Sequence, residues 1–135
     1  MPWSLLPYKS YKAGYRSKTN FPKMKIGIIL NTNEAETVWN CFRFGNEALA
    51  KSHSVKIFLL GKGVEAENIK DDKFPFLEGT VKKFLKNNGV ILACGACLKL
   101  RGDEESKICP ISTMEEMLKI VEESDKVVTF GWMAI

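Results

Sequence analysis

Short, unbroken apolar runs alternate along this chain with longer segments in which apolar residues recur every three or four positions. Four of these runs are Lys25–Leu30, Val55–Leu60, Val90–Ala93 and Lys126–Phe130. They are rich in β-branched side chains and lack the polar–apolar alternation of a half-exposed strand. Such runs are typical of strands buried on both faces of a parallel sheet. A weaker run, Ile108–Ile111, predicts a minor strand.

The segments between the runs predict three amphipathic helices, over Glu34–Ala50, Phe76–Asn87 and Ser112–Glu123. In each of them the apolar residues fall on one face at near-3.6 spacing. The third begins with Ser112-Thr113-Met114-Glu115, a capping-box sequence that predicts its N-terminus. Regular alternation of strand and helix predicts an α/β fold with a mostly parallel sheet of four or five strands. Right-handed crossovers would cover both faces of this sheet.

Binding and catalytic sites of open parallel sheets form beyond the carboxyl ends of the strands. Four short segments occupy that position here: Asn31–Asn33, Gly61–Gly63, Cys94–Cys97 and Gly131–Trp132. Gly61-Lys62-Gly63 lacks a third glycine and a Gly-Lys-Ser/Thr, so it is a weak phosphate-loop signal and we expect a tight turn. The cysteines are therefore the most chemically specific group at this edge.

The run Val90–Ala93 leads directly into Cys94-Gly95-Ala96-Cys97, followed by Leu98-Lys99-Leu100-Arg101. A cysteine between a strand and a helical turn meets unpaired backbone N–H groups, which favour the reactive thiolate. Lys99 and Arg101 add positive charge nearby. The three-residue offset places Cys97 one helical turn onward, close enough to attack a sulfur attached to Cys94. This spacing suits disulfide exchange and also persulfide transfer.

Two other uses of the cysteines remain open. Zinc normally takes four ligands, and a metal-binding module would have to recruit Cys109 beside Cys94 and Cys97. A non-enzymatic thiol sensor or interaction subunit would use the same Cys94–Cys97 pair. Cys41 falls within the first helix and is expected to be a small buried hydrophobe. The lone histidine, His53, precedes the second strand, so we expect it at the surface and at the opposite edge from the cysteines.

Composition suits one soluble domain, since the 135 residues are 45% hydrophobic and 27% charged. No apolar run approaches the roughly 20 residues of a membrane span, and the first residues lack the apolar core of a secretory signal. We therefore expect a cytoplasmic protein with no membrane partner. In that reducing compartment a Cys-x-x-Cys pair is more often redox-active or metal-binding than structural.

The net charge of +4 comes from the N-terminal segment. Residues 1–23 carry five basic groups and no acid, whereas the remainder has a net charge of −1. The domain itself is thus not expected to bind nucleic acid. Residues 1–23 are interpreted as an ill-ordered basic extension, and 24–135 as a single α/β domain. Trp3, Tyr8, Tyr11 and Tyr15 leave open a second role for the extension, as an arm that packs on a neighbouring subunit.

Taken together, these residues resemble the DsrE/DsrF-like sulfur-relay family, in particular its Cys-x-x-Cys branch. The resemblance covers about residues 24–132. It rests on Lys25–Leu30, on Cys94-x-x-Cys97-x-x-x-Arg101-Gly102 after the third strand, on the capped helix from Ser112, and on Asp125–Phe130. It implies a flavodoxin-like three-layer α/β/α sandwich that assembles into homotrimers or hexamers.

The resemblance also implies a function. Cys94 matches the family cysteine that accepts and donates persulfide sulfur, which would make this chain a sulfurtransferase that acts as a persulfide carrier. Its partners would be an upstream sulfur-donor protein and a downstream small sulfur-carrier protein, and no cofactor or metal is implied. Cys97 departs from relay members with a single cysteine and allows release through an internal disulfide. Arg101 is predicted either to stabilise the sulfur anion or to hold the turn.

Overall fold

Five parallel strands form one sheet in the computed structural model, which describes residues 22–102 and 110–131. The strands are β1 (Lys25–Leu30), β2 (Ser54–Leu59), β3 (Val90–Cys94), β4 (Ile111–Ser112) and β5 (Lys126–Phe130). Their order is β4-β3-β2-β1-β5, and all neighbours run parallel. The predicted sheet is confirmed. The minor strand is confined to two residues, and Ile108 and Cys109 fall outside the described ranges.

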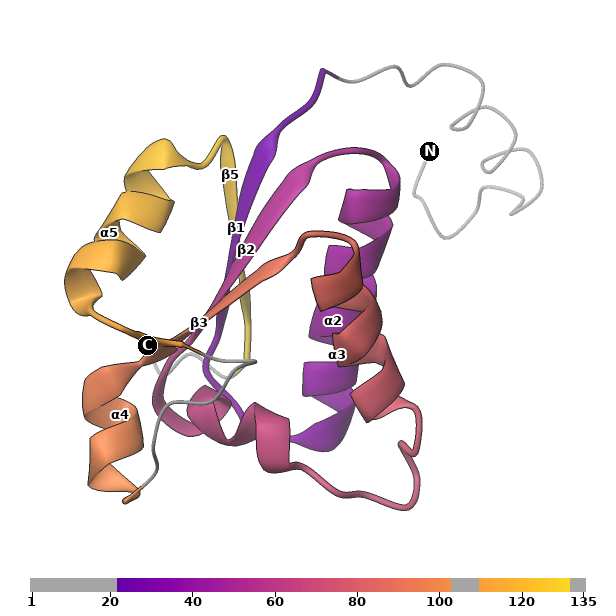
Figure 1. The fold of residues 1–135 in the computed structure, drawn as a ribbon, viewed down its shortest axis with the longest axis vertical. Helices are drawn as coiled ribbons and strands as arrows, with labels where there is room; N and C mark the ends of the chain where they lie inside the picture. The colour runs from indigo at the N-terminus through magenta and orange to yellow at the C-terminus, as the bar shows by residue number, and fades with distance from the viewer. Residues whose placement is uncertain (1–21, 103–109, 132–135) are drawn as a thin grey trace, which may run out of the picture.

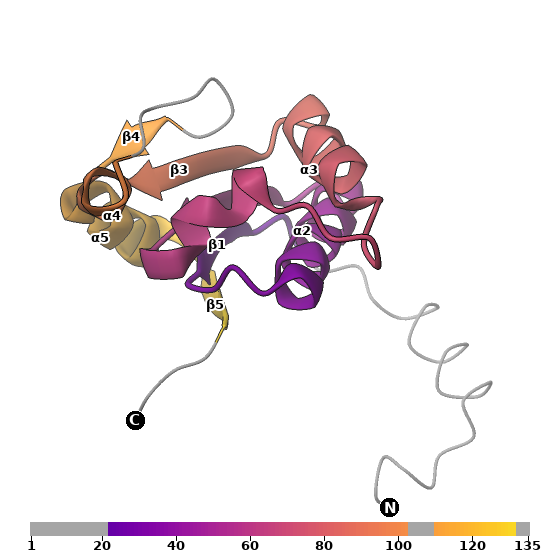
Figure 2. The same ribbon diagram turned by 90° about the horizontal axis from the view of Figure 1, so that it is seen from below.

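Helices cover both faces of the sheet, so the predicted three-layer α/β/α arrangement is confirmed (Figure 1). On one side lie α2 (Ala35–Ala50) and α3 (Leu77–Lys86), and on the other lie the shorter α4 (Gly95–Leu100) and α5 (Met114–Glu123). A 3₁₀ helix, η2 (Gly61–Asn68), follows β2. Figure 2 looks from below in the view of Figure 1, where η2 and α4 lie at the carboxyl ends of the strands.

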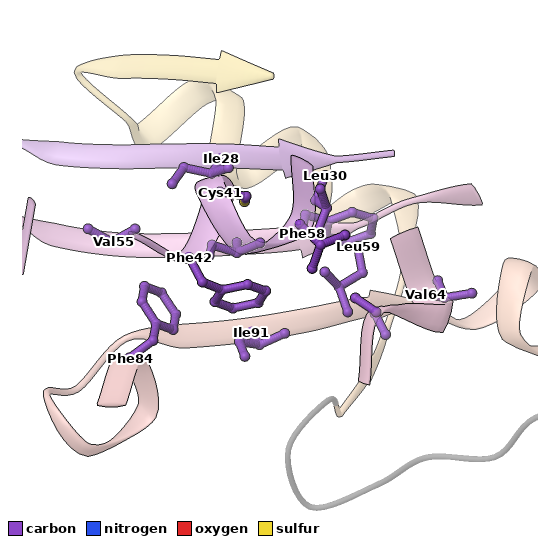
Figure 3. Close-up of a cluster of buried hydrophobic side chains, with 14 of the residues drawn as sticks. Ile28, Leu30, Cys41, Phe42, Val55, Phe58, Leu59, Val64, Phe84 and Ile91 are labelled. Carbon is purple, nitrogen blue, oxygen red and sulfur yellow. The ribbon is translucent and has the colours of Figure 1, made fainter. Parts of the chain in front are cut away.

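The core lies mainly between the sheet and α2 and α3 (Figure 3). Phe42 of α2 meets Phe84 of α3 edge-on, with ring centroids 5.5 Å apart and an interplanar angle of 80°. Both rings are almost fully buried, and so are Ile28, Ile57 and the other apolar residues of the inner strands. Burying a side chain of this size contributes about 1.5–3 kcal/mol. This packing fixes the central strands and therefore the positions of their carboxyl ends.

Two helix N-termini show how local sequence sets the element boundaries. The Glu34 carboxylate caps α2 by accepting the N–H of Glu36 at 2.7 Å, so this helix begins one residue later than predicted. At α5 the cap is Thr113, whose hydroxyl accepts the N–H of Glu116 at 3.4 Å. The capping box predicted from Ser112 is therefore displaced by one residue. Ser112 instead belongs to β4.

The segment after β2 differs from the prediction. A tight turn was expected at Gly61–Gly63, but a longer 3₁₀ helix, η2, spans Gly61–Asn68 and buries Val64 and Ala66. Gly63 packs directly on the backbone of β1, because a Cβ at this position would collide with the carbonyl oxygen of Leu30. The sheet edge thus needs glycine here for close approach and not for phosphate binding.

At the amino ends of the strands, the N–H of Met24 donates to Nδ1 of His53 at 3.0 Å. His53 is half-buried and makes a structural hydrogen bond, so the expected surface histidine is wrong in this respect. The extension predicted for residues 1–23 lies outside the described ranges up to residue 21, and its interpretation stays a prediction. Within the described ranges, no helix is both long and apolar enough to span a membrane.

Candidate functional site

The carboxyl ends of β2, β3 and β4 bring together residues that are far apart in the sequence. Leu59 of β2 pairs with Ala93 of β3, and Cys94 of β3 pairs with Ser112 of β4. Immediately beyond these pairs come Gly61 and the first turn of α4. Both cysteines of the Cys-x-x-Cys motif therefore lie at the sheet edge where the sequence predicted a site.

Cys94 is both the last residue of β3 and the N-terminal flanking residue of α4. Its φ and ψ of −61° and 115° keep it extended, and its side chain is only 3% exposed. The expected helical turn after it is confirmed. The sulfur, however, accepts no hydrogen bond from the N–H groups of that turn, contrary to the expectation that they would stabilise a thiolate there. The main local effect of the structure on Cys94 is burial.

Cys97 lies on α4, is half-buried, and is the thiol with the more accessible position. Its sulfur accepts the backbone N–H of Gly61 at 3.3 Å. Desolvation raises the pKa of Cys97, and a hydrogen bond with the Cys94 side chain raises it further. The Gly61 N–H and, to a smaller extent, the charge of Arg101 act in the opposite direction. The balance keeps Cys97 protonated beside Cys94.

Arg101 joins the cysteine helix to η2. Its Nε donates to Oε2 of Glu65 at 3.0 Å, and its Nη1 donates to the carbonyl oxygen of Cys97 at 3.1 Å. Of its two predicted roles, these contacts support the structural one, since the guanidinium fixes the end of α4 against η2. Its charge still lowers the pKa of Cys97, although other causes have larger effects.

The other cysteines lie apart from this pair or outside the described residues. Cys41 is fully buried in α2, and burial raises its pKa to about 12, so the expected small buried hydrophobe is confirmed. Cys109, the third ligand of the alternative metal site, and Trp132 fall outside the described residues. Within 22–102 and 110–131, no group of three His, Cys, Asp or Glu side chains is placed to hold a metal ion. The three-cysteine site itself stays a prediction.

A broad, open groove of about 950 Å³ lies between α2 and α3, lined by residues that include Trp39, Arg43 and Phe76. None of the three described cysteines, Cys41, Cys94 and Cys97, lines it. The Cys94–Cys97 pair and this groove are therefore on different parts of the described structure. We take the carboxyl edge of the sheet as the candidate functional site because it carries the two neighbouring thiols.

The sequence missed two contributors to the site. Glu65 was not singled out from the sequence, and the 3₁₀ conformation of η2 brings it to Arg101. Ser112 was taken for a helix cap, but it pairs with Cys94 across the sheet. Position in the sequence could have pointed to Glu65, because this residue follows Gly61 closely and Gly61 was predicted at the same end of the sheet as the cysteines.

The fold and the paired thiols define a class, namely a parallel α/β domain with a Cys-x-x-Cys pair at the carboxyl edge of its sheet. The model of the DsrE/DsrF-like family matches residues 24–130, and the chain belongs to that family.

Two archaeal relatives cover much the same part of the chain. "Uncharacterized protein MJ0989" of Methanocaldococcus jannaschii is 34% identical over 102 residues, which are 70% of this chain and 88% of that protein. "Uncharacterized protein MK0008" of Methanopyrus kandleri is 30% identical over 102 residues, 70% of this chain and 83% of the relative.

The structure also resembles that of the ychN protein from E. coli, with a TM-score of 0.69 and 18% identity, over 81% of this chain and 100% of that one. This likeness supports the fold. Membership of the family places the chain with proteins of the sulfur-relay type.

Proposed function

We propose that this protein carries sulfane sulfur in a sulfur relay, as a persulfide on Cys94 with Cys97 as the second thiol. The observation that carries the proposal is the adjacent pair of thiols at the functional edge of a DsrE-like sheet. A buried sulfur such as Cys94 protects a persulfide from solvent and stray thiols, while Cys97 is only half-buried. No metal or cofactor takes part in this chemistry.

Loading would proceed by attack of the Cys94 thiolate on the outer sulfur of a donor protein's persulfide. A new S–S bond forms on Cys94, the donor's S–S bond breaks, and the donor leaves as a thiol. Delivery would be the same step in reverse, with an acceptor thiolate attacking the outer sulfur on Cys94. Alternatively, Cys97 attacks the inner sulfur, which forms a Cys94–Cys97 disulfide and releases hydrosulfide; a dithiol reductant must then reset the pair.

The raised pKa of Cys97 has a definite role in this scheme. A protonated Cys97 is a poor nucleophile, because only the thiolate attacks sulfur. At neutral pH the internal disulfide therefore forms slowly, and the persulfide on Cys94 survives until an acceptor arrives. As pH rises toward the pKa of Cys97, release through the disulfide accelerates.

The partners that fit this scheme are a sulfur-donor protein and a small sulfur-carrier protein in the reducing cytosol.

We also propose a homotrimer or hexamer, in which a second copy covers the flank of α5 formed by Met114, Leu118 and Val121. These side chains are 53%, 57% and 43% exposed, and one helix face that exposes three large apolar residues is typical of an interface. Leu118→Lys should shift the oligomer toward monomer in sedimentation equilibrium, while Lys82→Glu on α3 should not.

Mass spectrometry after incubation with a cysteine desulfurase and cysteine tests the function. Wild-type protein and Cys41→Ala should gain 32 Da, the mass of one sulfur atom, on Cys94, and Cys94→Ala should gain none there. Cys97→Ala should load but lose the route of release through the disulfide. Folded wild-type protein that never carries added sulfur on Cys94 would rule out the proposal.

One observation favours a second candidate, a thiol redox switch. Cys94 and Cys97 already interact as reduced thiols, so an oxidant would need only a small rearrangement to join them. This candidate predicts a reversible disulfide that alters oligomer size or partner affinity while no sulfur is transferred. The same desulfurase experiment separates the two, because only the carrier gains mass.

A further inference from the structure

Ser112 has a buried hydroxyl that makes no hydrogen bond within the part of the chain that the structure describes. Its side chain is 7% exposed. A buried hydroxyl without a partner costs about 1–3 kcal/mol. Such groups in a native structure call for an explanation, and a catalytic or redox role is one of the recognised explanations.

The obvious structural reason for a serine at this position does not apply. Ser112 stands where the sequence suggests a helix cap, but Thr113 makes the capping hydrogen bond to the N–H of Glu116. Alanine would fill the same space in β4 without burying an unpaired hydroxyl. The hydroxyl of Ser112 is therefore left over after the requirements of the helix are met.

The neighbour of Ser112 in the sheet is Cys94. The two residues are opposite each other in the parallel β3–β4 pair, so their side chains point to the same face, on strands about 4.8 Å apart. Gly95 permits this close approach, since a Cβ there would lie 2.8 Å from Cγ2 of Ile111 and 3.2 Å from the carbonyl oxygen of Ser112. The glycine inside the Cys-x-x-Cys motif thus lets β4 pack against the start of α4.

We propose that the Ser112 hydroxyl binds the sulfane sulfur carried on Cys94. A second sulfur extends the Cys94 side chain by one S–S bond of about 2.05 Å, on the face of the sheet that Ser112 shares. Persulfides are stronger acids than thiols, so the outer sulfur is anionic at neutral pH and accepts the hydroxyl hydrogen. The hydroxyl, which has no partner among the described residues, gains one when sulfur is bound. This inference rests on the proposed function and adds a binding group to it.

The consequence is a preference for the loaded state. A hydrogen bond to a charged group is worth more than one between neutral groups, and here it replaces no earlier bond of the hydroxyl within the described residues. Ser112 should therefore raise the equilibrium retention of sulfur on Cys94 against a free thiol. In that exchange the outer sulfur moves from Cys94 to the thiol and a proton moves back, so no oxidant or reductant is needed.

The test measures how sulfane sulfur partitions between Cys94 and glutathione under anaerobic conditions. Full-length protein is loaded with inorganic polysulfide, equilibrated with glutathione, and analysed by mass spectrometry. Ser112→Ala should retain sulfur with an equilibrium constant about tenfold or more below wild type. Ser112→Thr restores a hydroxyl and should restore most of the retention. Thr113→Ala, which removes the α5 cap beside Ser112, should leave retention unchanged.

Denaturation of the unloaded proteins provides the second readout. Because the hydroxyl has no partner among residues 22–102 and 110–131, Ser112→Ala should unfold at the same denaturant concentration as wild type or a higher one, whereas Thr113→Ala should unfold at a lower one. Equal sulfur retention by wild type and Ser112→Ala would overturn the inference. So would a clear loss of unloaded stability in Ser112→Ala, which would show that the hydroxyl has a structural partner.

The same experiment distinguishes this inference from the proposed function. If polysulfide loads Cys94 with the expected dependence on Ser112 but a desulfurase does not load it, the proposed relay function is wrong. The proposed binding of sulfur by the Ser112 hydroxyl is then still supported. If a desulfurase loads wild type and Ser112→Ala with equal retention, the function stands and the binding group fails. A wild-type protein that polysulfide cannot load on Cys94 overturns the binding group as well.

Discussion

Replacing Gly63 by alanine should damage both the fold and the thiol site, because of how closely η2 packs on β1. A Cβ at position 63 would collide with the carbonyl oxygen of Leu30 and would lie 2.8 Å from its carbonyl carbon. The obstacle is backbone, so no rotamer change can relieve it. The same carbonyl oxygen accepts the N–H of Leu60 at 2.9 Å, so η2 cannot move away without straining that hydrogen bond.

The cost follows from these contacts. Overpacking against rigid structure typically costs about 1–3 kcal/mol, and weakening one backbone hydrogen bond adds about 0.5–1.5 kcal/mol. Val64 and Ala66, 4% and 5% exposed, would lose part of their packing as well. We therefore expect Gly63→Ala to lower the free energy of unfolding by about 2–4 kcal/mol. Because Gly61 moves with η2, the N–H of Gly61 should also withdraw from the sulfur of Cys97.

Gly79→Ala is the matched control. Gly79 lies within α3, and a Cβ there would meet nothing within 4 Å. Alanine should stabilise this helix by about 0.5–1 kcal/mol. Urea denaturation followed by circular dichroism measures both variants, and iodoacetamide labelling followed by mass spectrometry measures Cys97. If Gly63→Ala matched wild type within about 0.5 kcal/mol and Cys97 were labelled at the wild-type rate, the described packing of η2 would be wrong.

Two further variants test the electrostatics of the thiols. Burial raises the pKa of Cys41 from 9.0 to about 12. Above about pH 9 the unfolded chain therefore releases this proton while the folded chain keeps it. The stability that the buried neutral thiol contributes is fully present below about pH 9 and is lost as pH rises toward 12. The stability advantage of wild type over Cys41→Ala should therefore shrink by about 2.7 kcal/mol between about pH 8 and 11, as measured by urea denaturation, and a constant difference would contradict this reasoning. Arg101→Gln should cost less than about 1 kcal/mol, because the ion pair with Glu65 is partly exposed. It should also move the pH midpoint of Cys97 labelling upward, because the charge of Arg101 lowers the pKa of Cys97, and an unchanged midpoint would show that this charge does not reach the thiol.

Much of the fold follows from the local pattern of the sequence. The runs now seen as β1, β3 and β5 were predicted to within one residue, because short unbroken apolar runs mark strands of a parallel sheet. The predicted burial on both faces is wrong for β5, an edge strand in which Val127 is 40% exposed and no residue is fully buried. The predicted helix boundaries were less accurate. Where two neighbouring residues can both cap a helix, the sequence alone does not show which of them does so. Ser112 and Thr113 are both good caps, and the pairing of Ser112 with Cys94 decides between them.

The candidate site was predictable in position but not in its contacts. The rule that sites lie at the carboxyl ends of parallel strands placed Gly61 and the cysteines together. The hydrogen bond from Gly61 to Cys97 and the ion pair between Glu65 and Arg101 each join residues 36 positions apart. They depend on the 3₁₀ conformation of η2, which a glycine-rich, charged segment does not reveal by periodicity.

The bond between Gly61 and Cys97 couples the chemistry of this protein to completion of its sheet. Its two residues approach only after β2 and β3 have paired, and Ser112 reaches Cys94 only after β4 has joined them. An unfolded or half-folded chain therefore presents Cys94 and Cys97 as two ordinary, solvated thiols. Under the relay hypothesis, such a chain would retain sulfur poorly. Stable loading of Cys94 would therefore occur only after folding is complete, when the site can protect the persulfide.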